Sequence, residues 1–445
     1  MHSSRLPLSL AFTLCLALIS GSATAQTGAP PPDESLLGPF VVTGHAQEHV
    51  TKLAILPSLS PDLEDVIVRG VVRRDFELSG LFDVIPDRRA PSGLYGFDDP
   101  VDVNAWRKIG AEVIVKVAAR RHKSGQIQVF GLCYFLNVGK DPVYEKTLLV
   151  PASEVRVTAH RITDALLGAI TGRPGGFASR LTFAGRWGSN QRIFTMDSDG
   201  NALAAVTDPN DTSIAPTWGP HQSLYFSVSR KYSPFWLARL VGSQTERVKL
   251  SFTRSVYGVA FNKDYTQMAV AVAVKGGSAV YLGQPDGSGM KRVSRTVLAT
   301  HPVFSPSGKL AWIGGDPNKI TSRRVYVDGK AVSPAGFSAA APTFCDTEDG
   351  IRLVYSVSVG NNAQDLVLSA ENGGGIARLT QHQGSNTYPA CSIDGRLLAF
   401  FSTRSKQQAM YLMSLKRWKT QKLVDRYGES LRWVPLPPPA ASFSP

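Results

Sequence analysis

The sequence predicts a six-bladed β-propeller that follows a small α/β domain, and a repeated motif carries most of that prediction. The motif occurs five times at steps of 43, 43, 40 and 47 residues, and each copy leads through a turn into a short apolar run. A self-similar unit of about 40–50 residues built from short strands is typical of a propeller blade. The second residues of the five copies are Pro216, Val259, Pro302, Pro342 and Pro389.

Each unit has room for four strands. Two apolar runs follow the motif strand, and a fourth run comes after a turn such as Asp286-Gly287 or Asn372-Gly373. An Asx-Gly pair between two apolar runs indicates a tight hairpin, because glycine readily adopts the positive φ that the turn requires. Four strands in succession are what one blade needs.

The two ends of the array predict how the ring closes. Ser430–Trp433 begins a sixth motif that is soon cut off, and Ser179–Phe183 is a strand with no motif before it. We therefore expect both fragments to share the last of six blades, which would leave no open sheet edge at the closure. The alternative is a β-sandwich in which the spacing arises by chance.

The N-terminal residues suggest an exported protein, and the net charge bears on its partners. Met1–Ala25 has a basic start, an apolar stretch and a small-residue cleavage site, which together indicate a secretory signal. We expect a disordered leader over residues 26–39, the α/β domain over 40–172, the propeller over 173–434 and a disordered tail over 435–445. The net charge of +13 comes without a dense basic run, so we expect solvated surface charge and no nucleic-acid partner.

The predicted α/β domain has two long helices. The first should begin at Ser60-Pro61, end at Gly80 and bury one face, and the second should run from near Ser153 to Gly172. Strands are expected at 52–56, 84–85, 113–117, 126–136 and 143–150. The buried face of the first helix is predicted to contain Leu63, Val66, Ile67 and Val71, and that of the second Val155, Ala159, Ile162, Leu166 and Ile170.

The cysteines do not suggest a disulfide framework. Three remain after the signal, Cys133, Cys345 and Cys391, and an odd number argues against paired bridges. Cys391 replaces the aromatic residue of its motif, so we expect it in the core. Cys345 lies one place out of phase with Cys391, and the prediction is that the two are not bridged.

The sequence argues against an enzyme and against a bound metal or other cofactor. It lacks the Gly-x-Ser-x-Gly pattern of propeller-linked peptidases and the His-Glu-x-x-His zinc motif. Asp197–Asn201 is interpreted as a hairpin turn, and His160 as a packed residue beside the apolar stripe of its helix. A peptidase-associated propeller and a peptidoglycan- or glycan-binding propeller remain as alternatives.

Two segments resemble the TolB family, the periplasmic propellers of the Tol–Pal envelope system. His301–Gly308 is similar to the family motif x-P-x-[WF]-S-P-D-G, and the domain junction from Ala159-His160 to Leu181 follows the family pattern. The order of signal peptide, small α/β domain and propeller extends the resemblance over almost the whole mature chain. Val259 and Cys391 depart from the motif.

The resemblance implies a non-enzymatic, monomeric periplasmic hub that supports outer-membrane integrity and cell division. It would bind a Pal-like lipoprotein at one mouth of the propeller and a TolA-like inner-membrane protein through an N-terminal segment, and it would reach membranes only through these partners. The implied Pal rim consists of loop residues that lead into the motifs: Thr300, His301, Tyr257, Gly258, Ile214, Ala215, Thr387 and Tyr388. The implied TolA segment is centred on Phe40, Val41, Val42 and Thr43, which could instead form an ordinary first strand of the domain sheet.

Overall fold

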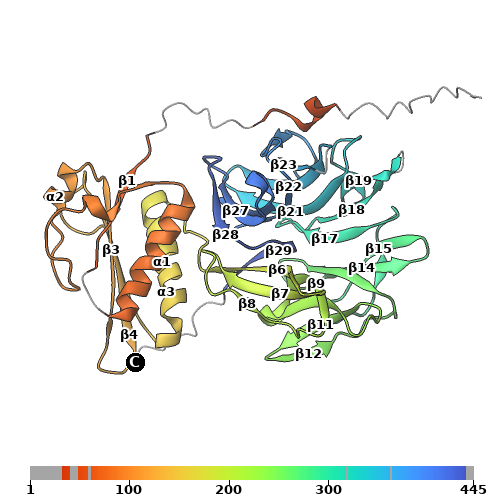
Figure 1. Ribbon diagram of the computed structural model, residues 1–445, viewed down its shortest axis with the longest axis horizontal. Helices are drawn as coiled ribbons and strands as arrows, with labels where there is room; N and C mark the ends of the chain where they lie inside the picture. The colour runs from red at the N-terminus through yellow and green to blue at the C-terminus, as the bar shows by residue number, and fades with distance from the viewer. Residues whose placement is uncertain (1–32, 41–48, 59–61, 317–318, 361–362, 437–445) are drawn as a thin grey trace, which may run out of the picture. The chain divides into compact units, whose positions relative to one another are not determined.

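The computed structural model describes residues 33–40, 49–58, 62–316, 319–360 and 363–436. These residues form one mixed five-stranded sheet with helices and six four-stranded sheets (Figure 1). The architecture confirms the predicted α/β domain and six-bladed propeller. The predicted signal peptide, the leader up to residue 32 and the tail from residue 437 lie outside the described residues.

The sheet of the α/β domain has the strand order β2-β1-β3-β4-β5. Strand β1 pairs in parallel with β2 and β3, whereas β3, β4 and β5 pair in antiparallel fashion. The strands are β1 (Lys52–Ile55), β2 (Asp83–Val84), β3 (Val113–Arg121), β4 (Ile127–Phe135) and β5 (Tyr144–Val150).

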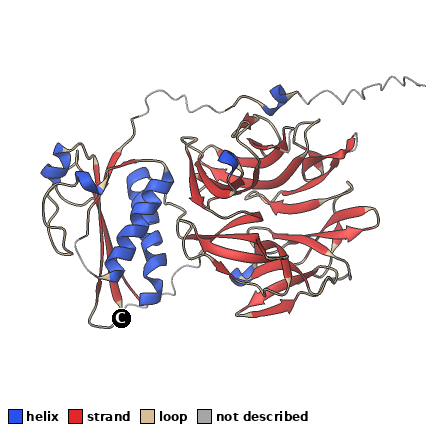
Figure 2. Cartoon of the chain, viewed as in Figure 1, coloured by secondary structure: helices blue, strands red, loops and turns tan. Residues whose placement is uncertain are grey.

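Helices α1 (Leu63–Ser79) and α3 (Val155–Thr171) lie side by side and pack on β3 and β4 (Figure 2). Gly80 and Gly172 end these helices with φ of 65° and 78°, as predicted from their positions. The short helix α2 (Val103–Lys108) was not predicted; the side chain of Asp102 accepts a hydrogen bond from Ala105 N at its start. Three 3-10 turns precede the propeller strands in the chain: η1 (Glu34–Leu37), η2 (Asp87–Arg89) and η3 (Ala152–Glu154).

The buried face of α1 agrees with the predicted one only in part. Leu63 and Val66 are 68% and 55% exposed, and the buried stripe consists of Val68, Val71, Val72 and Phe76. These residues follow an i, i+3, i+4, i+8 spacing, which also satisfies helical periodicity. Val71 is buried and Ile67 packs against the core, as predicted. The prediction was wrong for Leu63 and Val66 because apolar residues occur around more than one side of α1, and only packing on the sheet selects the buried side. The predicted start at Ser60-Pro61 lies outside the described residues.

The propeller blades are numbered here by the order of their first strands. Blades 1 to 5 are continuous in sequence, and blade 6 combines both ends of the array. Blade 1 contains β9 (Thr212–Trp218), β10 (Leu224–Ser229), β11 (Trp236–Val241) and β12 (Gln244–Arg247); blade 2 contains β13 (Val256–Phe261), β14 (Met268–Val274), β15 (Gly277–Gly283) and β16 (Lys291–Arg292). Blade 3 contains β17 (Thr300–Phe304), β18 (Leu310–Asp316), β19 (Lys319–Val327) and β20 (Lys330–Ala331); blade 4 contains β21 (Ala339–Thr347), β22 (Gly350–Ser358), β23 (Gln364–Ala370) and β24 (Ala377–Arg378). Blade 5 contains β25 (Asn386–Cys391), β26 (Leu397–Ser402), β27 (Ala409–Ser414) and β28 (Thr420–Val424), and blade 6 contains β29 (Gly428–Pro435), β6 (Ser179–Trp187), β7 (Asn190–Asp197) and β8 (Ala204–Ala205). Two 3-10 turns, η4 (Pro220–Gln222) and η5 (Arg404–Lys406), lie in blades 1 and 5.

The closure of the ring follows the prediction. Strand β29 pairs antiparallel with β6, and Trp433 lies opposite Leu181 in the register. The strand extends to Pro435, and Leu436 N donates to Ala178 O at 3.0 Å. The start of the predicted disordered tail is therefore ordered, because the backbone of β6 offers further ladder partners there.

A disulfide joins Cys345 of blade 4 to Cys391 of blade 5, and the prediction of no bridge was wrong. Side chains alternate between the two faces of a strand, so a shift of one place turns a side chain to the opposite face. Cys345 consequently faces blade 5, where it packs with Leu398, while Cys391 faces back toward blade 4. Their Cα atoms are 5.4 Å apart, which suits a disulfide. The out-of-phase position is what brings the two sulfurs together.

Candidate functional site

A β-bulge interrupts the first strand of every blade just where the predicted Pal rim lies. In each blade two consecutive residues of the first strand face one residue of the second strand. Such an extra residue leaves the regular ladder and bends the strand. At the residue just before the motif proline, or its equivalent in blade 6, five blades carry a non-glycine residue with a positive φ near 50°. These residues are Ala215 (50°), His301 (52°), Ala341 (47°), Tyr388 (49°) and Ser430 (54°). Blade 2 has Gly258 at that place.

We call Ala215, Gly258, His301, Ala341, Tyr388 and Ser430 the bulge ring. Four members have small side chains, and the other two, His301 and Tyr388, are aromatic. The rings of His301 and Tyr388 lie 6.2 Å apart between centroids, although blade 4 separates their blades. Both side chains must therefore extend past Ala341 toward the propeller axis. The small neighbours leave the space that the two aromatic rings occupy.

The location of the predicted rim needs one correction. All eight predicted residues lie within the first strands β9, β13, β17 and β25, not in loops before them. The motif proline suggested a loop, but its φ and its missing N–H are also accommodated by a bulge. Of the eight, Tyr257 is the most accessible, at 39%, whereas Thr387 is buried. Thr300, Ile214, Ala215, His301 and Tyr388 are partly buried.

Polar groups that sequence reasoning missed surround the bulge ring. Tyr388 donates its hydroxyl to Glu429 Oε2 at 3.2 Å, and Glu429 Oε1 accepts from Gln191 Nε2 at 2.7 Å. Burial, together with the charges of Arg432 and Arg323, lowers the pKa of His301 to about 4, so its imidazole is neutral near pH 7. Arg432 belongs to the truncated sixth motif and Glu429 immediately precedes it, and no spacing signal in the sequence distinguished either residue.

The predicted TolA segment begins on blade 4. Residues Asp33–Phe40 were predicted to be largely disordered, but Glu34–Leu37 form the turn η1, and Asp33 Oδ1 accepts from Ser35 N at 3.0 Å. Leu37 is fully buried among residues of blades 3 and 4 such as Phe337 and Tyr355. Composition alone suggested disorder because this docking surface exists only in the folded propeller.

The segment then continues along the outer edge strand β24. Arg378 N donates to Pro39 O at 2.9 Å, and Phe40 forms a parallel bridge with Arg378. The Arg378 guanidinium also lies 2.7 Å from Glu34 Oε2 and pairs with the buried Asp365. Phe40 therefore contacts the propeller, not the sheet of the α/β domain. Val41, Val42 and Thr43 lie outside the described residues.

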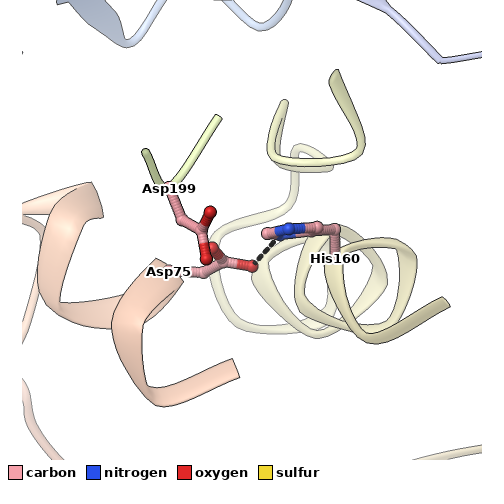
Figure 3. A group of neighbouring side chains, drawn as sticks. All are labelled: Asp75, His160 and Asp199. Carbon is pink, nitrogen blue, oxygen red and sulfur yellow. Dashed lines mark hydrogen bonds and ion pairs between the residues drawn. The ribbon is translucent and has the colours of Figure 1, made fainter. Parts of the chain in front are cut away.

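A buried group of charged side chains connects the α/β domain to blade 6 (Figure 3). His160 Nδ1 of α3 lies 2.8 Å from Asp75 Oδ2 of α1, and both side chains are fully buried. Arg156 Nε lies 2.6 Å from Asp197 Oδ2, and its Nη2 pairs with Asp199 in the turn after β7. The structure thus places His160 at the junction, as interpreted from the sequence, but within ion pairs that the sequence did not reveal. Asp75, His160 and Asp199 could each offer one metal-ligating atom, yet Arg156 already neutralises part of the group.

The connection between α3 and β6 is fixed by a second carboxylate. Asp164 Oδ1 and Oδ2 accept from Phe177 N at 2.7 Å and from Ala178 N at 2.8 Å. Burial raises the pKa of Asp164 to about 7, although these two backbone donors favour its charged form. The linker is therefore held by a carboxylate that binds a proton near neutral pH.

Comparisons with known proteins agree with this architecture. The family model of the TolB amino-terminal domain matches residues 42–132. The Tol-Pal system protein TolB of Anaeromyxobacter dehalogenans is 28% identical over 228 residues, which are 50% of this chain and 52% of the relative. The Tol-Pal system protein TolB of Dinoroseobacter shibae is 31% identical over 218 residues, which are 47% of this chain and 48% of the relative. The chain thus spans about half the length of the curated relatives that it matches.

A solved structure is similar over a longer stretch. The crystal structure of TolB from Acinetobacter baumannii superposes with a TM-score of 0.72 and 18% sequence identity, covering 87% of this chain and 98% of that one. At this identity the similarity supports the fold. Among the described residues, no helix is both long enough and apolar enough to cross a membrane.

Proposed function

We propose that this chain, which resembles TolB proteins in its amino-terminal domain, in half of its sequence and in its fold, is a non-enzymatic periplasmic scaffold of the Tol–Pal envelope system. It binds a Pal-like lipoprotein through the face of the propeller around the bulge ring. It binds a TolA-like inner-membrane protein through the segment that begins at Leu37. Through these contacts it supports outer-membrane integrity and cell division.

The observation that carries the proposal is the docking of the N-terminal segment on β24. Strand β24 is the outer edge of blade 4, and Phe40 pairs with it through the backbone. A segment that can add to one sheet edge can also add to the edge of a partner's sheet, since the backbone donors and acceptors are the same. Docking on the propeller and binding to the partner then compete for this segment.

The Pal-like partner is assigned to the bulge ring for a different reason. The first strands of all six blades converge there, and they present Tyr257 as an exposed aromatic side chain. Aromatic side chains are enriched in the energetically important parts of protein interfaces. Tyr388 and His301 are partly buried and lie against each other, so they affect the rim through its shape as well as by direct contact.

The two binding functions can be tested separately with the exported full-length protein. Its affinity for the Pal-like and TolA-like proteins of the same genome is measured by calorimetry. Removing residues 26–49 should abolish TolA binding and preserve Pal binding; a truncation that still bound TolA at full strength would contradict the assignment of this segment. As a control, removing residues 437–445 should affect neither.

The rim is tested with a matched pair of exposed tyrosines. Tyr257→Arg should weaken Pal binding at least tenfold, whereas Tyr232→Arg, at a fully exposed position of blade 1, should not. Both variants should keep the wild-type melting temperature because neither side chain is buried. Unchanged Pal binding by Tyr257→Arg would place the site elsewhere on the propeller.

A further inference from the structure

The ion pairs at the domain junction contain more negative than positive groups. Three carboxylates, Asp75, Asp197 and Asp199, surround His160 and Arg156. Arg156 balances one of the three carboxylates, so with all three ionised a neutral His160 leaves two negative charges in excess, and an imidazolium leaves one. Burial raises the pKa of Asp75, whereas the contact with His160 favours its ionised form. Asp75 is fully buried and the Asp199 side chain is 1% exposed, and uncompensated charge in such surroundings is costly.

The orientation of His160 also suits a doubly protonated ring. Its Nδ1 lies 2.8 Å from Asp75 Oδ2, and its Nε2 lies 3.9 Å from Asp197 Oδ2 (Figure 3 shows the Asp75 side). Among the described residues, His160 Nε2 and Asp75 Oδ1 are buried without a hydrogen-bond partner. An imidazolium places a positive N–H toward a carboxylate on each side, whereas a neutral ring turns one nitrogen lone pair toward negative charge.

These groups come from different parts of the fold. Asp75 belongs to α1, His160 and Arg156 to α3, and Asp197 and Asp199 to the end of β7 and the turn that follows it. We propose that His160 is a proton-operated lock, in which the imidazolium holds α1 and α3 of the α/β domain against blade 6 and its deprotonation weakens that contact.

The direction of the pKa shift agrees with this lock. Burial favours the neutral ring, but the charges of Asp75, Asp199 and Asp197 outweigh burial and raise the pKa of His160 above its ordinary value of 6.5. Asp197 and Asp199 belong to blade 6, so the part of the shift that they cause depends on docking, whereas Asp75 acts within the α/β domain. A group whose pKa is raised by docking stabilises the docked state at low pH. That stabilisation is complete below the pKa of the undocked histidine and disappears as the pH rises through the docked value. The lock is therefore closed in acid and weaker in mild alkali.

Nearby Asp164 must be separated from His160 in any experiment. It lies on the same helix, its pKa is raised to about 7 by burial, and the charge of Asp75 contributes to that shift. His160→Gln retains a polar side chain of similar reach but has no charged form, and it leaves Asp164 in place. Asp75→Asn removes the main anion beside His160 and should return the pKa of His160 toward 6.5 or below.

The decisive measurement is the imidazole titration in the full-length wild-type protein by NMR. The His160 signal, assigned by its loss in His160→Gln, should titrate above the ordinary imidazole value of 6.5. A His160 signal that is already neutral at pH 6.5 would overturn the proposal. This result needs only the wild-type fold, so it holds even if a variant is poorly folded.

The mechanical consequence is measured by hydrogen exchange, corrected for the chemical effect of pH. Peptides covering 155–164 and 195–201 should lose about tenfold of their protection for each pH unit by which docking raises the pKa. The loss should be absent in His160→Gln, and the core strand 268–274 should not respond in either protein. Equal pH responses of both proteins would refute the lock. A zinc-induced gain in protection that chelator reverses would also refute it, because the group would then be a metal site.

Discussion

Trp433 Nε1 donates a hydrogen bond to Ser179 Oγ at 2.6 Å, although the two residues are 254 positions apart in the chain. The bond joins the last strand of the propeller to its first and lies within the β29–β6 pairing. Blade 6 thus depends on both ends of the array, and the ring cannot close without β29.

Removing the closing strand should unfold the propeller. A chain that stops after Tyr427 lacks β29 and leaves the edge of β6 without its partner, so we expect loss of the cooperative melting transition. A chain that stops after Leu436 keeps all described contacts and should melt like the full-length protein. Circular dichroism during heating distinguishes the two, and an unchanged transition in the shorter chain would argue against closure by β29.

The disulfide between Cys345 and Cys391 should stabilise the contact between blades 4 and 5. The cysteines are 46 positions apart, and a cross-link over such a loop is worth about 2–4 kcal/mol in the chain-entropy account. Cys345→Ala combined with Cys391→Ala should lower the free energy of unfolding by this amount and should make it insensitive to reductant. Chemical denaturation with and without dithiothreitol measures both effects. Equal stability of the wild-type and double variant would show that the bridge is dispensable.

Gly395 and Gly308 occupy equivalent turns in blades 5 and 3 and form a matched pair. Both have positive φ, 70° and 88°, but a methyl group at Gly395 would collide with the carbonyl oxygen of Asp346, whereas one at Gly308 would meet nothing within 4 Å. Gly308→Ala should therefore cost about 1 kcal/mol and Gly395→Ala about 2–4 kcal/mol. Urea denaturation can compare them, and equal losses would contradict the close approach at Gly395.

The stability should depend on pH through Asp164. Its pKa is raised from 3.8 to about 7 in the folded protein, so the folded state binds more protons than the unfolded state between these values. The free energy of unfolding should then fall as the pH rises across this interval, by at most about 1.4 kcal/mol per pH unit from this group. Asp164→Asn should reduce the slope in urea denaturation at pH 4.5 to 7.5. The exposed Asp208→Asn is the control, and identical slopes in all three proteins would remove Asp164 from the account.

Leu37 should hold the N-terminal segment on the propeller. It is fully buried, and replacing a buried leucine by alanine costs about 2–5 kcal/mol, which corresponds to an increase of about 30-fold or more in the undocked population. Leu37→Ala should therefore accelerate hydrogen exchange of residues 34–40 and strengthen TolA binding. Leu36→Ala is a matched control because Leu36 is next to Leu37 in the chain but its side chain is 51% exposed. Equal exchange in the two variants would mean that Leu37 does not anchor the segment.

The sequence by itself determined the blade repeat, the closure and the two-helix domain. Those features follow from local rules: the short apolar runs such as Met268–Val274, the Asx-Gly turns, and the glycines that end α1 and α3. Such rules depend only on residues close in the chain. The small helix α2 was missed because six residues carry too little periodicity to recognise.

The tertiary structure alone decided which distant residues meet. The bridge between Cys345 and Cys391, the contact of His301 with Tyr388 past a small alanine, and the ion pair of His160 with Asp75 all depend on how blades and helices face each other. The docking of Leu37 required a surface built from blades 3 and 4, so the composition of the leader could not indicate it. Local sequence fixes the face of its own strand or helix to which a side chain points, whereas its partner is set by the packing of elements far away in the chain.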